Sequence, residues 1–257
     1  MHPVLTRILG FPLYSCAVNN LLAFLLSAAL ALWLGRLRRY PWKLTLGLWT
    51  VTASLAALGC RLGVVVQSPV YFAQHPLAVL NPFGGTVMGG LLFSTASVWL
   101  LGRRKGWPGL DLLDFLAPPL LLCMAWVRVG CLLHGCCFGR LSQVPWAITY
   151  PAGNLGRGVP GGPRHPAPLY EMGLDLGLLA GLLWLGPRQR YAGQGIYALY
   201  AGYGVIRFLG EMTRDVPVGT PFTLYQWAAL AFLGFGALGL AGAWGRPPVR
   251  RDWPTVS

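Results

Sequence analysis

Long apolar runs, separated by short polar segments, dominate the hydrophobic pattern of the chain. Seven of them approach the length of a membrane span, at approximately 13–35, 44–66, 79–101, 112–133, 168–186, 194–210 and 222–244. A helix needs about 20 predominantly apolar residues to cross a bilayer, and an open sheet would leave unpaired backbone groups in hydrocarbon. The pattern therefore predicts an all-α, polytopic membrane protein with seven transmembrane helices. The sixth run gives the weakest signal, because it is short and contains Arg207.

Composition supports the same fold class. Of the 257 residues, 55% are hydrophobic and only 11% are charged, whereas a soluble domain carries about 25% charged residues. We find no internal repeat and no low-complexity linker, so we expect one integral membrane domain over residues 1–257. The loops are short except for 134–167. A loop of that length is usually functional or disordered, and we expect it to form a small irregular head on the outer face.

The net charge of +13 is unevenly distributed between the two sets of alternate loops. Twelve basic residues lie on one side, namely Arg36, Arg38, Arg39, Lys43, Arg103, Arg104, Lys105, Arg188, Arg190, Arg246, Arg250 and Arg251. The other side has five, namely Arg7, Arg140, Arg157, Arg164 and Arg214. Lysine and arginine concentrate in cytoplasmic loops, so the N-terminus is predicted outside and the C-terminus in the cytoplasm. The charge is therefore mainly a topology signal, and we expect no nucleic-acid partner.

Three arginines lie inside the predicted spans. Arg61, Arg128 and Arg207 are each flanked by apolar residues, and an intramembrane arginine indicates a functional site unless its side chain snorkels to a helix end. The nearest carboxylates in depth are Glu171 and Glu211, with Asp175 deeper; Glu211 follows Arg207 by four residues, which permits an intrahelical pair. Spare guanidinium groups beside lipid favour a phosphate ligand, which they bind bidentately.

The stretch VRVGCLLHGCCFGR, residues 127–140, combines a cation, thiols and an imidazole. On a continued helix, Arg128, Cys131, His134 and Cys137 would form one stripe, because they are spaced by three. Gly135 and Gly139 are expected to end that helix at the outer surface. Four interpretations are open: a metal site, a redox pair, packing of small residues, or a site for lipid phosphate and thiol chemistry. We favour the last, with no metal and no cofactor.

Eight short segments, in order along nearly the whole chain, carry a family resemblance. They are HPV (2–4), RLGVVV (61–66), YFAQHPLAVL (71–80), GGTVMGGLL (84–92), RVGC (128–131), RHPAPLYE (164–171), YGVIRFLGEMTR (203–214) and TLYQ (223–226). Together they resemble the prolipoprotein diacylglyceryl transferases of bacteria. Their number, order and spacing make the resemblance specific, and the family's seven-helix topology with an outer N-terminus agrees with the count of apolar runs.

The resemblance implies an enzyme of the bacterial inner membrane that transfers the diacylglyceryl group of phosphatidylglycerol. The implied acceptor is the lipobox cysteine thiol in the signal peptide of a preprolipoprotein; a thioether forms and glycerol phosphate leaves. Such a reaction requires thiol activation and cations where charge develops on the phosphate. The implied catalytic residues are Arg128, Arg207, Glu211 and, as a replacement base, His134. The implied substrate-binding residues are Arg61, Gly89, Gly90, Cys131, Cys136, His165, Tyr170 and Glu171.

The chain departs from the family pattern on the side that handles the thiol. Cys131 stands where the family has asparagine, and Cys136 where it has glutamate. Met88 replaces a histidine or tyrosine, so a proposed base position is lost. Three alternatives therefore accompany the transferase: a paralogue with another acceptor, a non-catalytic lipid-binding protein, and a thiol-redox membrane protein on the same scaffold.

Overall fold

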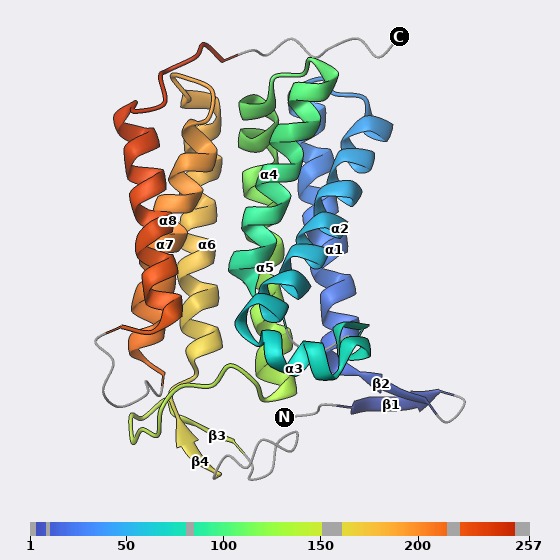
Figure 1. The fold of residues 1–257 in the computed structure, drawn as a ribbon, viewed down its shortest axis with the longest axis vertical. Helices are drawn as coiled ribbons and strands as arrows, with labels where there is room; N and C mark the ends of the chain where they lie inside the picture. The colour runs from blue at the N-terminus through green and yellow to red at the C-terminus, as the bar shows by residue number, and fades with distance from the viewer. Residues whose placement is uncertain (1–3, 9–10, 81–84, 151–160, 215–221, 250–257) are drawn as a thin grey trace.

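The computed structural model describes residues 4–8, 11–80, 85–150, 161–214 and 222–249 (Figure 1). Its long helices are α1 (Ser15–Leu37), α2 (Trp42–Gln67), α4 (Val87–Lys105), α5 (Gly109–His134), α6 (Ala167–Leu185), α7 (Gln194–Met212) and α8 (Leu224–Ala241). Its short elements are β1 (Val4–Ile8), β2 (Phe11–Tyr14), α3 (Pro69–Gln74), η1 (Pro76–Leu80), β3 (Ile148–Tyr150), β4 (Gly162–Arg164) and η3 (Gly186–Arg188). The all-α fold class is thus confirmed.

The long helices lie side by side along one direction (Figure 1). Five helices in the described part of the chain are long and apolar enough to cross a membrane: α1, α2, α5, α6 and α8. The other two carry charge, since α4 ends in three basic residues and α7 contains Arg207 and Glu211. Seven spans therefore remain a prediction, although the structure forms a helix at each of the seven apolar runs.

The predicted start of the third span is wrong. The apolar run suggested a helix from residue 79, but η1 ends at Leu80 and α4 begins at Val87. The intervening sequence NPFGGT, residues 81–86, contains a proline and two glycines. These residue types disfavour a continuous helix. The hydropathy of the run does not reveal them, because it measures only how apolar the segment is.

Helix α5 forms the centre of the bundle and contacts α1, α4, α6 and α7. Its first half is buried on every side, with Leu112, Phe115, Leu116 and Leu121 at most 3% exposed. The outer helices instead expose large apolar side chains such as Leu21. Because α5 is held on several sides, its last turn, which leads into the cysteine-rich stretch, has a well-defined position.

The two ends of the bundle differ in character. The strands and α3 lie at one end, and the loops that follow α1, α4 and α6 lie at the other (Figure 1). At the second end, exposed tryptophans accompany the basic loops: Trp33, Trp42, Trp184 and Trp244. The predicted head, 134–167, belongs to the first end, where β3 and β4 pair antiparallel. It is therefore less irregular than predicted, and its residues 151–160 lie outside the described part.

Candidate active site

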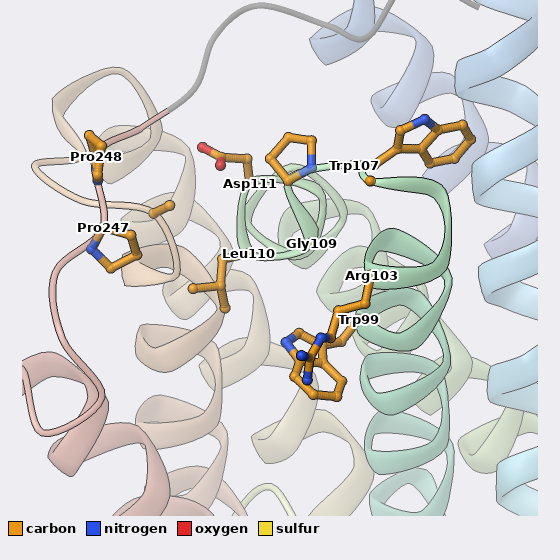
Figure 2. Close-up of a pocket in the computed structure, with 11 residues that line it drawn as sticks. Trp99, Arg103, Trp107, Gly109, Leu110, Asp111, Pro247 and Pro248 are labelled. Atoms are coloured by element: carbon orange, nitrogen blue, oxygen red, sulfur yellow. The ribbon is translucent and has the colours of Figure 1, made fainter.

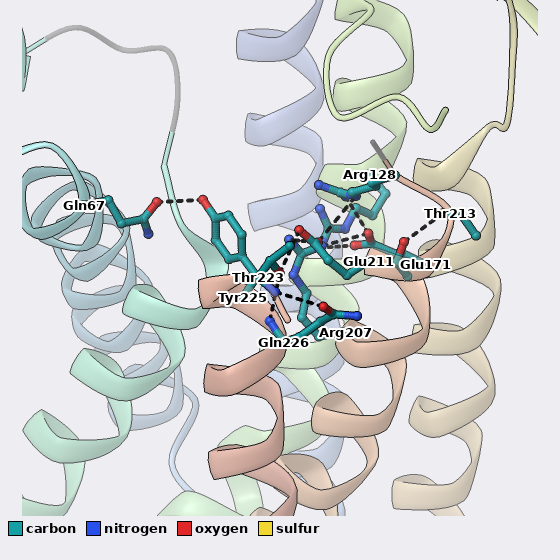
Figure 3. Close-up of polar contacts among 11 residues, drawn as sticks. Gln67, Arg128, Glu171, Arg207, Glu211, Thr213, Thr223, Tyr225 and Gln226 are labelled. Atoms are coloured by element: carbon teal, nitrogen blue, oxygen red, sulfur yellow. Dashed lines mark hydrogen bonds and ion pairs between the residues drawn. The ribbon is translucent and has the colours of Figure 1, made fainter. Parts of the chain in front are cut away.

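A buried carboxylate, Glu171, lies at the centre of the polar network in Figure 3. Its Oε1 accepts hydrogen bonds from Arg207 Nη1 at 3.0 Å and from Arg214 Nη2 at 2.5 Å, and its Oε2 forms an ion pair with Arg128. The carboxylate comes from the first turns of α6, whereas the three guanidinium groups come from α5, α7 and the residues after α7. One carboxylate therefore joins three segments that are far apart in the sequence.

Glu211 is the second carboxylate of the network. Arg207 Nη2 lies 2.8 Å from Glu211 Oε2, which is the intrahelical pair that the four-residue spacing permits. Thr223 Oγ1 donates to Glu211 Oε1 at 3.3 Å, while the same threonine caps α8 in a capping box with Gln226. The Arg207 guanidinium also lies 4.8 Å from the centre of the Tyr225 ring. The start of α8 thus holds Arg207 from the side opposite Glu171.

The network is buried near the helix ends. Arg128, Glu171, Arg207 and Glu211 are 1–7% exposed. Arg128 lies six residues before the end of α5 and Arg207 five before the end of α7, which places them about 8–9 Å inside those ends. With Arg214, three arginines face two glutamates, so these five side chains carry one net positive charge. Buried charge is costly and usually marks function.

Two donors of the network make no hydrogen bond, although Arg214 Nε lies 4.0 Å from Glu211 Oε2. Arg128 Nε and Arg214 Nε are buried and find no hydrogen-bond partner within the described residues. A buried donor without an acceptor costs free energy. Both atoms therefore suit an anionic oxygen supplied by a ligand.

The cysteine-rich stretch begins with a Schellman motif. Gly135 has φ of 75° and donates its N–H to the carbonyl of Leu132 at 3.2 Å, and Cys136 donates its N–H to the carbonyl of Cys131 at 3.0 Å. This hydrogen-bond pattern ends α5 and brings the fourth-last residue of the helix beside the second residue after it. Those two positions are Cys131 and Cys136, so the predicted helix end at Gly135 is confirmed.

Cys137 completes a group of three thiols. Its φ of 59° lies in the left-handed region, which is uncommon for a residue with a side chain. The sulfur atoms of Cys131, Cys136 and Cys137 lie within 4.8 Å of one another, and each residue is half-buried. The predicted stripe on a continued helix is wrong for Cys137, because the chain turns at Gly135 and returns this thiol toward the end of α5.

Ionisable groups around this turn are perturbed. Hydrogen bonds from the Cys131 and Cys136 thiols, together with the charges of Arg128 and Arg214, hold the pKa of the Cys137 thiol well below its ordinary value. Burial, reinforced by the cysteines, raises the pKa of the Tyr150 phenol to about 12. The thiol cluster and the arginine network are thus electrostatically coupled.

The chain that leaves the cysteines is fixed by backbone contacts. Gly139 donates its N–H to the carbonyl of His165 at 2.9 Å, and Arg140 donates to the carbonyl of Thr213 at 2.8 Å. Arg164 Nη1 donates to the Gly139 carbonyl at 3.1 Å, and its guanidinium lies 4.9 Å from the centre of the Phe138 ring. The loop is therefore clamped between β4 and the end of α7.

Gly139→Ala is expected to lower the free energy of unfolding by about 1–3 kcal/mol. An added Cβ would lie 2.6 Å from both the Thr213 carbonyl oxygen and His165 Cβ, so the backbone clamp must open. Thermal unfolding in detergent, followed by tryptophan fluorescence, measures the change. Gly177→Ala is the control, because a Cβ there meets no described atom within 4 Å; equal stability of the two variants would contradict the clamp.

His165 and Tyr170 lie together in the segment RHPAPLYE, residues 164–171. The His165 ring nitrogen Nδ1 lies 3.1 Å from the Tyr170 hydroxyl, which accepts a hydrogen bond from Trp146 Nε1 at 2.6 Å. This chain of contacts links the head segment to the first turn of α6. His134 is buried at the last position of α5, next to the turn that carries the thiols.

The remaining predicted residues lie on α2 and α4. Gly89 and Gly90 allow close packing of these helices, because a Cβ on Gly90 would be 2.6 Å from Cys60 Sγ and one on Gly89 2.5 Å from the Gly59 carbonyl oxygen. Arg61 is half-exposed on α2 beside Cys60 and is not one of the arginines around Glu171. A substrate-binding role for these three residues stays a prediction.

Sequence reasoning did not identify Arg214 and Arg164 as residues of the site. It also did not predict that the Asp175 carboxylate is fully buried. Arg207, Glu211 and Arg214 are spaced by four and three, so one face of a helix joins them, and this spacing could have identified Arg214. Asp175 is fully buried one turn beyond Glu171, and neither of its oxygens has a hydrogen-bond partner in the described part of the chain. No local sequence signal links Arg164 to the cysteine loop.

A separate cavity of about 270 Å³ lies at the opposite end of the bundle (Figure 2). Its lining includes Trp99, Arg103, Asp111, Pro247 and Pro248. Its wall includes the first residue of α5, which is nineteen residues before Arg128 and therefore about 29 Å away along the helix. The cavity is thus no part of the site around Glu171.

Comparison with known proteins agrees with this arrangement. The family model described as prolipoprotein diacylglyceryl transferase matches residues 3–241. A protein of Bordetella parapertussis, named phosphatidylglycerol–prolipoprotein diacylglyceryl transferase, is 34% identical over 202 residues, 75% of each chain. Proteins of the same name from Methylibium petroleiphilum and Nitratidesulfovibrio vulgaris are 37% and 30% identical, covering 73% and 82% of this chain and 67% and 82% of their own. The chain belongs to the prolipoprotein diacylglyceryl transferase family.

Proposed function

We propose that the protein transfers the diacylglyceryl group of phosphatidylglycerol to the lipobox cysteine thiol of a preprolipoprotein signal peptide. The observation that carries the proposal is the buried arginine network around Glu171, with its net positive charge and its two unused donors. The relatives of this protein are named for phosphatidylglycerol as the donor and prolipoprotein as the acceptor. The protein acts as one integral membrane domain and uses no cofactor for binding the donor.

The phosphate of the donor lipid binds at Arg128, Arg207 and Arg214. A phosphodiester adds one negative charge, which neutralises the net charge of the network, and its oxygens accept from Arg128 Nε and Arg214 Nε. When the bond between the glyceryl carbon and the phosphate oxygen breaks, a second negative charge develops on the leaving glycerol phosphate. Guanidinium groups already in place stabilise that charge without reorganisation.

The glutamates orient the arginines. Glu171 and Glu211 each contact the Arg207 guanidinium, at 3.0 and 2.8 Å. The plane of the guanidinium therefore keeps its orientation while the second negative charge develops on the phosphate. A buried site of this kind also excludes water, which would otherwise compete for the donor lipid. These residues are therefore assigned as catalytic (Arg128, Arg207) and as positioning groups (Glu171, Glu211).

The acceptor side consists of the turn after α5 and the head. Cys131, Cys136 and His134 belong to that turn, and His165 and Tyr170 order the segment that packs against it. The assignment of His134 as the base that takes the thiol proton stays a prediction.

We further propose that the end with the strands faces outward. The loops after α1, α4 and α6 carry basic residues at the opposite end (Figure 1), as expected for a cytoplasmic surface. Green fluorescent protein fused to the C-terminus should therefore fluoresce, and alkaline phosphatase fused there should be inactive. The reverse pattern would overturn this orientation.

The function is tested with purified protein in phosphatidylglycerol liposomes and a lipobox peptide. We expect the peptide to gain the mass of a diacylglyceryl group with release of glycerol phosphate, and both signals to vanish in Arg207→Ala. Arg140→Ala is the control, because Arg140 is an exposed arginine near the same end. Lipid binding without transfer would instead favour a lipid-binding protein or a paralogue with another acceptor.

A further inference from the structure

The three thiols beside the arginine network form a donor set for a thiophilic metal ion. Their sulfur atoms lie within 4.8 Å of one another. Tetrahedral zinc has Zn–S bonds of about 2.3 Å, which separates its sulfur ligands by about 3.8 Å. Small side-chain rotations in half-buried residues are enough to close the remaining gap.

Two backbone features hold the thiols in this arrangement. The Schellman motif brings Cys131 and Cys136 together through the hydrogen bond between their backbones, and the left-handed conformation of Cys137 returns the third sulfur to them. Strained backbone at a residue with a side chain persists where the surroundings enforce it and often marks a functional site. Simple packing of small residues requires no such conformation.

The charges of the two clusters balance before the donor lipid binds. Zinc with three thiolates carries one net negative charge, and the network of Arg128, Arg207, Arg214, Glu171 and Glu211 carries one net positive charge. The arginines therefore stabilise the zinc thiolate complex rather than oppose the cation. The same complex would be unfavourable beside a neutral network.

We infer that Cys131, Cys136 and Cys137 bind a zinc ion with an open fourth position, and that the acceptor cysteine thiol occupies this position during the transfer. Catalytic zinc sites typically have three protein ligands and one exchangeable position. The inference replaces the expectation from the sequence that this stretch binds no metal. It deepens the proposed function and rests on it for the identity of the acceptor. It also supplies activation of the acceptor thiol.

The step is a substitution at carbon. The acceptor thiol binds zinc and loses its proton to solvent, because coordination favours the thiolate, so this route does not require His134 as the base. The sulfur then attacks the glyceryl carbon that bears the phosphate, a C–S bond forms, and the C–O bond to the phosphate breaks. Its electron pair leaves with glycerol phosphate beside the arginines, and the thioether, a weaker ligand, leaves the metal. No oxidant or reductant is needed.

Zinc content of the purified full-length protein is the first measurement. We expect about one zinc per chain in the wild type and below about 0.1 in each of Cys131→Ser, Cys136→Ser and Cys137→Ser. Cys123→Ser is the matched control, because Cys123 is a half-buried cysteine of α5 outside the cluster, and it should keep the metal. Metal-free wild type with a disulfide among the three cysteines would overturn the site and favour a redox pair.

Cobalt replacement tests the fourth position without any transfer. A Co²⁺ protein should show the absorption bands of tetrahedral thiolate coordination, and adding a lipobox peptide should shift them. The same peptide with serine in place of cysteine should leave them unchanged. Identical spectra with both peptides would overturn the role of the fourth position.

The liposome assay separates this inference from the proposed function. Transfer that survives zinc removal and all three cysteine variants would reject the zinc step while leaving the transferase in place. A protein that binds one zinc and shifts its cobalt spectrum with the cysteine peptide, yet transfers nothing, would reject the proposed function while leaving the metal and thiol site in place.

Discussion

Glu171→Gln is expected to lower the free energy of unfolding by about 3–5 kcal/mol. Glutamine keeps the size of the side chain and removes the negative charge that Arg128, Arg207 and Arg214 share. Three guanidinium groups would then remain in a buried site with only Glu211 to offset them. Chemical denaturation in detergent micelles measures the change, and transfer should be lost at temperatures where the variant remains folded.

Asp175→Asn is the matched control for this prediction. Asp175 lies one turn further along α6, is fully buried, and its oxygens accept no hydrogen bond from the described residues. Removing a buried carboxylate of that kind is expected to leave stability unchanged or raise it by about 1 kcal/mol. If both variants lost the same stability, the loss would not be specific to the ion pairs of Glu171.

The positions of the helices could be predicted from hydropathy because each long helix must present an apolar surface. The exceptions have local causes. Helix α4 begins eight residues later than predicted, at Val87, because proline and glycine interrupt the run before it. The strands were not predicted, since three-residue elements such as β3 and β4 have too few positions to show an alternating pattern.

The parts of the candidate site that depend on residue spacing within a single helix could be predicted from the sequence. The pair Arg207–Glu211 follows from the four-residue interval, and the end of α5 follows from Gly135. The convergence of Arg128 and Arg214 on Glu171 depends on how α5, α6 and α7 pack, and no single segment encodes it. The return of Cys137 toward Cys131 depends on one left-handed backbone conformation at a residue type that rarely adopts it.

Arg128→Lys is expected to slow transfer by about 10²–10³-fold while the protein stays folded. Lysine keeps the positive charge that pairs with Glu171, so the network retains its balance. It loses the planar fork, and with it the buried Nε donor that has no partner among the described residues. In the liposome assay the variant should therefore have a lower kcat. Lysine still attracts the phosphate, but its ammonium group is poorly aligned with the charge that develops on the leaving glycerol phosphate.

Arg140→Lys is the control for this change, since it makes the same substitution at an exposed arginine twelve residues further along the chain. Its transfer rate should match the wild type. A slow Arg128→Lys with an unchanged melting temperature would assign the phosphate to the guanidinium fork, because charge and fold are both preserved. A wild-type rate in Arg128→Lys would show that a point charge is enough at this position, and the leaving phosphate would then have to be stabilised by Arg207 and Arg214 alone.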